Sequence, residues 1–366
     1  MGFISIVGKV ALSALISVLP LAGASATPPA AAKKAPAAPD AGVELVPEFT
    51  LASRLPGGEG AADLGAWTRH VPGIQAVSIP SPADGSAQRA FFHAPKAEGK
   101  RPLLVVLHSW STDWRQNIGV PYAKFAARNG WAFIHPDFRG PYRRPEAAAS
   151  DLVAQDIVDA VEYAKQHADV DTSRIYLAGF SGGGMTALAM AARRPELWAG
   201  VLAWAPVVDL PAWYEHNATR FPKRRYAGDV AAVCGGPPRP GAPAYDECRK
   251  RSPIALLDGA RLSGVPIYIA TGVRDDIVPP DHTLRAFNLL AAPADRIPEE
   301  AIRHVVARGA VPAALQGAAV DEAYRRAGAP LRLDRASGRA RVVLFEGGHD
   351  VVYNPGLAWL SAQRRP

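Results

Sequence analysis

Short apolar runs alternate with amphipathic stretches along the chain from about residue 74 onwards. The runs have the length of strands buried on both faces, and polar or glycine-containing turns bound them. Strands are expected at 74–80, 88–95, 102–108, 131–137, 174–180, 200–206, 265–272 and 340–348. Helices are expected at 122–130, 149–168, 184–195 and 356–363. Such alternation predicts an α/β fold with a mostly parallel sheet and helices on both of its faces.

Two segments, residues 209–262 and 281–330, interrupt this alternation. The first is rich in aromatic residues, arginine, proline and glycine, and the second has the pattern of two or three short helices. Both follow expected strands, so we expect both near the carboxyl edge of the sheet, where ligands bind in such folds. Residues 46–366 are therefore expected to form one domain with two insertions.

The first 26 residues have the pattern of a secretory signal peptide. Lys9 precedes an apolar stretch, and the Ala-Ser-Ala triplet at 24–26 fits a cleavage site. An uncleaved membrane anchor is the alternative, although Pro20 interrupts the apolar stretch. Residues 27–45, rich in alanine and proline, are expected to be an extended linker. We therefore expect a secreted or periplasmic protein without stable membrane insertion after cleavage.

Charge and cysteine content narrow the classes of partner. The 366 residues carry a formal net charge of +7 without a dense basic run interleaved with aromatic residues, so nucleic-acid binding is not expected, whereas anionic substrates are compatible with this charge. Cys234 and Cys248 are the two cysteines, and export predicts that they form a disulfide. Two free buried thiols are the alternative. Two thiols make a poor zinc site, and neither a metal nor a cofactor is expected.

The stretch "GFSGG" at 179–183 places Ser181 between an expected strand and an expected helix. This is the context that the G-x-S-x-G motif of serine hydrolases requires. A strand that turns abruptly into a helix holds the serine in a strained conformation, and larger flanking side chains would clash there. The helix N-terminus supplies free N–H groups, so the Gly182 N–H is expected to bind an oxyanion.

A nucleophilic serine needs a general base and an acid that orients this base. Asp275 and Asp276 follow one expected strand, and His349 follows the last one. The order serine, acid, histidine is the one that the motif requires. From position alone, either aspartate could orient His349, which would then take the proton of Ser181.

The second oxyanion donor is expected in the loop after an earlier strand, within "LHSWSTDW" at 107–114. The backbone amides of Ser109 and Trp110 are the candidates. His108 precedes Ser181 and ends a buried run, so we expect it to organise this loop rather than to act as the base.

Together these residues resemble the catalytic domain of the prolyl oligopeptidase-like branch of the α/β-hydrolase superfamily, over residues 74 to 363. The matching pieces are "LHSWS", "DFRG", "GFSGGG", "GVRDDIVP" and "GGHD". The resemblance implies an α/β-hydrolase fold. It also implies that Ser181 is the nucleophile, His349 the base, Asp275 the acid and the Trp110 amide an oxyanion donor.

The resemblance further implies a serine hydrolase that acts on a small-molecule or polysaccharide ester. Too few residues precede the first expected strand for a β-propeller, so acetyl or feruloyl esters on carbohydrate are expected ahead of peptides. The side chains of Trp110 and Trp213 could form platforms for sugar or aryl rings, or belong to the core. A serine peptidase of the same family and a non-catalytic glycan-binding protein are the alternative functions.

Overall fold

The computed structural model describes residues 2, 42–96, 98–257, 264–316 and 320–365. The expected signal peptide, apart from Gly2, and the expected linker up to residue 41 lie outside the described residues. The chain divides into Met1–Pro36 and Ala37–Pro366, and the description below concerns the second unit. Among the helices in the described ranges, none combines the length and the apolar character that a membrane span requires.

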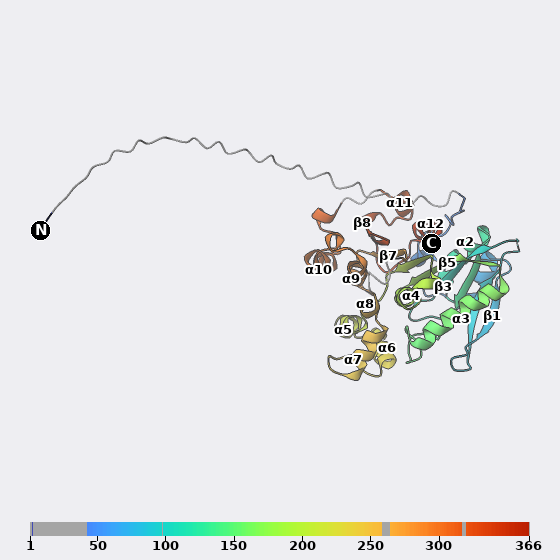
Figure 1. Cartoon of the computed structure of the whole chain (residues 1–366), viewed down its shortest axis with the longest axis horizontal. Helices are drawn as coiled ribbons and strands as arrows, with labels where there is room; N and C mark the ends of the chain where they lie inside the picture. The colour runs from blue at the N-terminus through green and yellow to red at the C-terminus, as the bar shows by residue number, and fades with distance from the viewer. Residues whose placement is uncertain (1, 3–41, 97, 258–263, 317–319, 366) are drawn as a thin grey trace, which may run out of the picture. The chain divides into compact units, whose positions relative to one another are not determined.

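Nine strands of the described chain form one sheet in the order β1-β2-β4-β3-β5-β6-β7-β9-β8 (Figure 1). Pairing is parallel from β4 to β9 and antiparallel at both ends of the sheet. The strands are β1 (Gln75–Pro80), β2 (Ala87–His93), β3 (Arg101–Leu107), β4 (Ala132–Pro136), β5 (Val170–Phe180), β6 (Gly200–Trp204), β7 (Ile267–Gly272), β8 (Leu331–Ser337) and β9 (Ala340–Phe345). The predicted α/β fold is confirmed.

The helices cover both faces of this sheet. They are α1 (Leu64–His70), α2 (Val120–Arg128), α3 (Asp151–His167), α4 (Gly182–Arg193), α5 (Leu210–Arg220), α6 (Tyr226–Cys234), α7 (Pro243–Arg251), α8 (Pro253–Leu256), α9 (Pro280–Leu290), α10 (Glu299–Arg308), α11 (Glu322–Arg326) and α12 (Tyr353–Ser361). Alternate residues of β3 enter two different cores. Val105 packs in the core that contains α3 and α4, whereas Val106 packs in the core that contains α2 and α12.

Strand β8 was not expected from the sequence. Its residues alternate, but most of them are polar and only Leu333 and Ser337 are buried. The strand pairs with β9 alone, at the edge of the sheet. An edge strand that is mostly polar and only partly buried lacks the apolar run by which the other strands are recognised.

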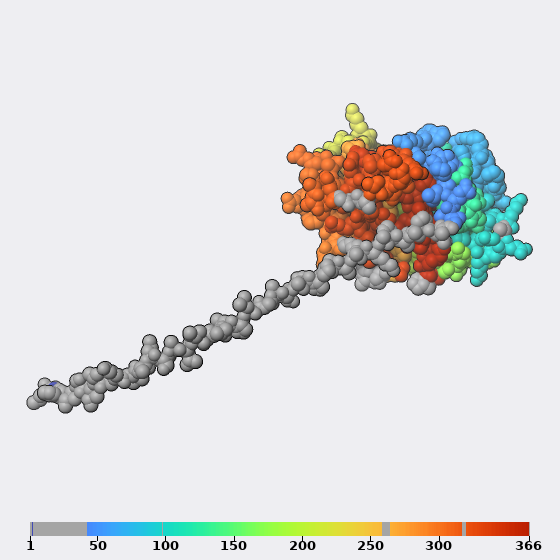
Figure 2. Space-filling view, turned by 90° about the horizontal axis from the view of Figure 1, so that it is seen from above, coloured from blue at the N-terminus to red at the C-terminus, as the bar shows by residue number. Residues whose placement is uncertain are grey.

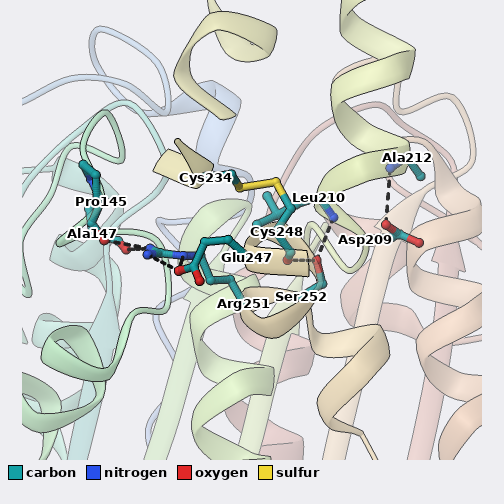
Figure 3. The surroundings of a disulfide bond; sticks show 10 residues. All are labelled: Pro145, Ala147, Asp209, Leu210, Ala212, Cys234, Glu247, Cys248, Arg251 and Ser252. Atoms are coloured by element: carbon teal, nitrogen blue, oxygen red, sulfur yellow. Dashed lines mark hydrogen bonds and ion pairs between the residues drawn. A yellow bond between two sulfur atoms is a disulfide. The ribbon is translucent and has the colours of Figure 1, made fainter. Parts of the chain in front are cut away.

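The segment between β6 and β7 contains α5 to α8, and a disulfide joins α6 to α7 (Figure 3). Cys234 and Cys248 are paired as the sequence predicts, with their Cα atoms 5.3 Å apart. Close to this disulfide, the Ser252 hydroxyl donates to the carbonyl of Cys248 and accepts from the Leu210 N–H. The start of α5 and the end of α7 are therefore tied together, and we call residues 209–257 the helical insertion.

The N-terminal residues of this unit lie beside the C-terminal ones. Figure 2 shows the blue and red parts of the chain side by side. Leu51 forms a β-bridge with Val352, and the Tyr353 N–H donates to the Thr50 carbonyl. The segment before α1 thus packs against the loop that follows β9.

A buried ion network connects the segment after β4 to α3. The side chain of Arg139 is 5% exposed, and its Nε donates to Asp156 Oδ2 at 2.5 Å. Other guanidinium nitrogens of Arg139 bind Asp84 and the Ser81 hydroxyl. The hydrogen bond from the Arg139 guanidinium holds the pKa of Asp84 well below its usual range. The network fixes the "DFRG" segment that precedes the loop to α3.

We expect Arg139→Ala to lower the free energy of unfolding by about 3–5 kcal/mol, because the buried Asp156 carboxylate would lose its counter-charge. Urea denaturation followed by circular dichroism measures this loss. The matched control is Arg325→Ala, which removes an exposed arginine paired with Glu322 and should leave the midpoint unchanged. Equal midpoint shifts in the two variants would contradict a structural role for the Arg139 network.

Candidate active site

Ser181 lies at the tight turn between β5 and α4. Its backbone has φ 58° and ψ −116°, a region that residues with a side chain rarely adopt. Its N–H donates to the Trp204 carbonyl at 2.8 Å, and its carbonyl accepts from the Met185 N–H at 2.9 Å. These bonds to β6 and α4 hold the strained turn in place.

Two of the flanking glycines are required by close backbone approach. A Cβ at Gly179 would lie 2.2 Å from the Gly183 carbonyl oxygen, and a Cβ at Gly182 would lie 2.9 Å from the Trp110 nitrogen. Neither position has room for a side chain. The glycines therefore let the turn close and let the loop after β3 touch the start of α4.

Asp275 and His349 come from neighbouring parallel strands and meet at the carboxyl edge of the sheet. His349 Nδ1 lies 2.7 Å from Asp275 Oδ2. Oδ1 of the same carboxylate accepts from the Ile277 and Val278 N–H groups at 3.0 and 2.9 Å, and the Thr271 hydroxyl donates to Oδ2. Because an ionised carboxylate only accepts, this bond favours the tautomer with the proton on Nδ1 and leaves Nε2 free to accept a proton.

Asp276 has a different environment from its neighbour. Its side chain is 62% exposed and pairs with Arg224 at 2.8 Å, whereas the Asp275 side chain is fully buried. Of the two aspartates that the sequence left open, the structure brings Asp275 to His349.

His349 also lies beside the turn that carries Ser181. Its ring centroid is 4.6 Å from that of Phe180, the residue before the serine. No hydrogen bond joins the Ser181 hydroxyl to His349 within the part of the chain that the structure describes. In structures without substrate, such contacts are often longer than in the reacting complex.

The loop after β3 reaches the start of α4 at Trp110. The Trp110 carbonyl accepts from the Tyr142 N–H at 2.9 Å, while its own N–H donates to none of the residues that the structure describes. Gly182 begins α4, so its N–H lacks an acceptor within the helix. The N–H groups of Trp110 and Gly182 thus lie near each other beside Ser181, and neither has an acceptor among the contacts described above.

His108 is buried at the base of this loop. Its Nδ1 lies 3.0 Å from the Ser109 carbonyl and its Nε2 lies 2.6 Å from the Asp137 carbonyl. The ring stacks on Phe138 with centroids 4.1 Å apart. His108 therefore connects the loop to the segment after β4, in agreement with the organising role expected from its position.

Comparison with known proteins gives a family match over part of the chain. Residues 122–302 match the prolyl oligopeptidase family. The match covers just under half of the 366 residues. This match begins in α2 and ends in α10, so it includes Ser181 and Asp275, whereas Trp110 and His349 lie outside it.

Curated relatives of the chain include proteins named as esterases. A putative esterase, NocK, of Nocardia uniformis subsp. tsuyamanensis is 31% identical over 213 residues, which cover 55% of this chain and 57% of that protein. Acetylxylan esterase A of Emericella nidulans is 28% identical over 128 residues, 32% of this chain and 41% of that protein. The chain therefore aligns with about half the length of each of these relatives.

A solved structure supports the same fold. A Mycobacterium tuberculosis puromycin-hydrolyzing peptidase has a TM-score of 0.50 at 15% identity, over 79% of this chain and 37% of that chain. The chain thus has the α/β-hydrolase fold that the resemblance implies.

The two tryptophans proposed as substrate platforms are buried in the structure. Trp110 is 1% exposed and Trp213 is fully buried, and their rings pack edge to face with centroids 4.8 Å apart. Neither ring presents an open face, because the helical insertion lies over the loop after β3. Of the two alternatives that the sequence left open for these side chains, their burial favours the core over a platform.

The helical insertion instead bonds to both loops of the site. The Trp213 indole N–H on α5 donates to the Ile277 carbonyl at 2.7 Å, beside the Asp275 turn. The Trp110 indole N–H donates to Asp229 Oδ2 on α6 at 3.3 Å. Asp229 was not singled out from the sequence. It is a buried carboxylate whose indole partner lies 119 residues away, and no local motif marks it.

A second contact that the sequence did not reveal supports the loop of His349. The next residue, Asp350, accepts from the Ser53 hydroxyl at 2.5 Å and from the Ser53 N–H at 3.1 Å. Burial raises the pKa of Asp350. The segment before α1 therefore supports the His349 loop from the side. In the described ranges, no group of three His, Cys, Asp or Glu side chains is placed to hold a metal ion.

We expect Asp275→Asn to abolish the downfield proton resonance of the His349 Nδ1–H, because the charge-assisted bond would be lost. Proton NMR at neutral pH measures this signal. Asp276→Asn is the matched control, since it removes the neighbouring carboxylate and should leave the resonance in place. Loss of the signal in the Asp276 variant alone would contradict the pairing.

Proposed function

We propose that the chain is a serine hydrolase that cleaves carboxylic esters through Ser181, His349 and Asp275. The observation that carries this proposal is the 2.7 Å contact between His349 Nδ1 and Asp275 Oδ2. It lies at the same sheet edge as the strained turn of Ser181. This combination supplies a nucleophile position, a base and a group that orients the base.

In the first step, Ser181 Oγ attacks the acyl carbon and its proton passes to His349 Nε2. Asp275 stabilises the imidazolium that forms. Negative charge develops on the former carbonyl oxygen, and the N–H groups of Gly182 and Trp110 are available to bind it. Such preorganised donors stabilise the tetrahedral intermediate relative to the bound ester.

The intermediate collapses when the carbon–oxygen bond to the alcohol breaks, and His349 returns the proton to the departing alcohol. The acyl group is then bound to Ser181 as an ester. In the second half, water attacks the acyl carbon while His349 Nε2 takes its proton. The bond from the acyl carbon to Ser181 Oγ then breaks, and the imidazolium returns the proton to Oγ. The acid product carries the acyl group.

The relatives support ester substrates, because the names of NocK and of acetylxylan esterase A state esterase activity. Acetyl or feruloyl esters on carbohydrate are the substrates that we propose. The prolyl oligopeptidase family match favours a second candidate function, a serine peptidase. The same three residues would serve both reactions, so relative kcat/KM on acetylated xylo-oligosaccharides and on short peptide amides separates them.

We also propose that the protein works in an oxidising compartment, secreted or periplasmic. The pairing of Cys234 with Cys248 supports this location, because structural disulfides form and persist outside the reducing cytosol. The signal-peptide pattern of the first 26 residues supports it independently.

Ser181→Ala should remove hydrolysis of 4-nitrophenyl acetate and labelling by a fluorophosphonate probe, because no nucleophile would remain to form the acyl bond. Initial rates and mass spectrometry of the labelled protein measure the two effects. A circular dichroism spectrum equal to that of the wild type would show that the fold is kept. Undiminished turnover by this variant would exclude Ser181 as the nucleophile.

Asp275→Asn should lower kcat by about 10⁴, because an amide would favour the wrong histidine tautomer. Asp276→Asn should keep kcat within about a factor of three, because that residue lies on the exposed side of the turn and forms a surface ion pair. Steady-state kinetics on one neutral ester compares the two. The reverse ranking would assign the acid to Asp276.

A further inference from the structure

A basic segment of the helical insertion, residues 220–225, lies between the two loops that flank Ser181. Arg224 donates to the Asp276 carbonyl at 3.0 Å and to Asp276 Oδ2 at 2.8 Å, so it touches the turn that holds Asp275. Arg225 pairs with Asp229 at 3.0 Å, and Asp229 accepts the Trp110 indole N–H. The segment therefore extends from the turn that holds Asp275 to the loop after β3 that holds Trp110.

Two of the four cations in this segment are paired with carboxylates, and two are not. Arg224 and Arg225 have Asp276 and Asp229 as partners. Arg220 and Lys223 are exposed, and neither forms an ion pair within the described ranges. Two positive charges at this position are thus left for a ligand or for solvent.

The segment is also held in a defined position. The Arg224 guanidinium carbon lies 3.7 Å from the centroid of the Phe221 ring, a distance at which cation and ring attract. An open depression of about 640 Å³ is lined by Lys223, Arg224 and Arg225 together with the Asp229 carboxylate, which Arg225 neutralises. The depression has room for a sugar or aryl group that bears a carboxylate. Arg220 lines a separate depression with Asp281 and Arg285.

We propose that this basic segment selects esters that carry a carboxylate near the scissile bond, on the alcohol or on the acyl side. The inference rests on the proposed esterase function. A substrate carboxylate would be attracted by Lys223, which lines the depression and whose charge is not neutralised, while the reacting ester lies at Ser181. Attraction between solvent-exposed charges is modest and is screened by salt, so the segment contributes selectivity rather than catalysis.

Two pairs of esters test the proposal at pH 7 and low ionic strength. The alcohol-side pair is 4-acetoxybenzoate with its neutral counterpart 4-acetoxybenzamide. The acyl-side pair is the mono-4-nitrophenyl ester of adipate with 4-nitrophenyl hexanoate. For each pair, the ratio of kcat/KM for the anionic ester to that for the neutral ester is compared between proteins, so that the different leaving groups cancel.

Lys223→Glu should lower this ratio by about fivefold in at least one pair, because the local charge changes by two units. It should leave kcat/KM on the neutral esters within about a factor of two. Raising the ionic strength to about 0.5 M should lower the wild-type ratio towards that of the variant, since salt screens the attraction between exposed charges. The pair that responds identifies the side that bears the carboxylate.

Lys100→Glu is the matched control. Lys100 is also an exposed lysine, but it immediately precedes β3, at the sheet edge opposite to the one that carries Ser181. The same change of charge there should leave both ratios unaltered. If Lys223→Glu and salt alter neither ratio, or if Lys100→Glu lowers them equally, the proposal is overturned. Failure of the proposed function would be distinct, because the wild type would then hydrolyse none of the four esters.

Discussion

The strained backbone of Ser181 is the constraint on which the arrangement of the site depends. A residue with a side chain at φ 58° costs about 1–3 kcal/mol and persists only where its neighbours over-determine it. Here β6 binds its N–H, and α4 binds its carbonyl. On the other side, Gly179 and Gly182 let backbone atoms approach to distances that exclude a Cβ. The turn, the first residues of α4 and the loop after β3 therefore hold one another in place.

The order of strands explains how residues far apart in sequence complete the site. β7 and β9 are parallel neighbours, so the turn after one and the loop after the other lie at the same edge, and Asp275 meets His349 across 74 positions. The helical insertion leaves the same edge after β6, which lies between β5 and β7. Its Asp229 can therefore bind the Trp110 side chain of the loop after β3, and its Trp213 can bind the turn that holds Asp275. Topology alone brings these contacts together.

The elements and motifs that a local pattern of residues encodes could be predicted from the sequence. Contacts between residues far apart in the sequence could not. Apolar runs predicted the buried strands. Short motifs predicted the tight turn at Ser181 and the positions of Asp275 and His349. β8 was missed because it is largely polar and only partly buried at the edge of the sheet. Trp213 was interpreted as a possible platform because an aromatic residue in an irregular segment has the same pattern whether exposed or buried.

The contacts of Asp229 and Ser53 could not be found at all. Their partners lie 119 and 297 residues away, and a single aspartate or serine without a surrounding motif carries no sign of such a partner. Only the fold reveals which carboxylate is buried against which donor.

The carboxylate of Asp275 binds a different kind of partner from those of Asp276 and Asp229. Asp275 accepts from two backbone N–H groups and a hydroxyl besides His349, and no lysine or arginine contacts it in the described part of the chain. A guanidinium there would compete with the imidazolium for the carboxylate charge that the base needs. Arg224 and Arg225 are instead bound by Asp276 and Asp229. The basic segment can thus bring positive charge to the edge of the site without weakening the contact between Asp275 and His349.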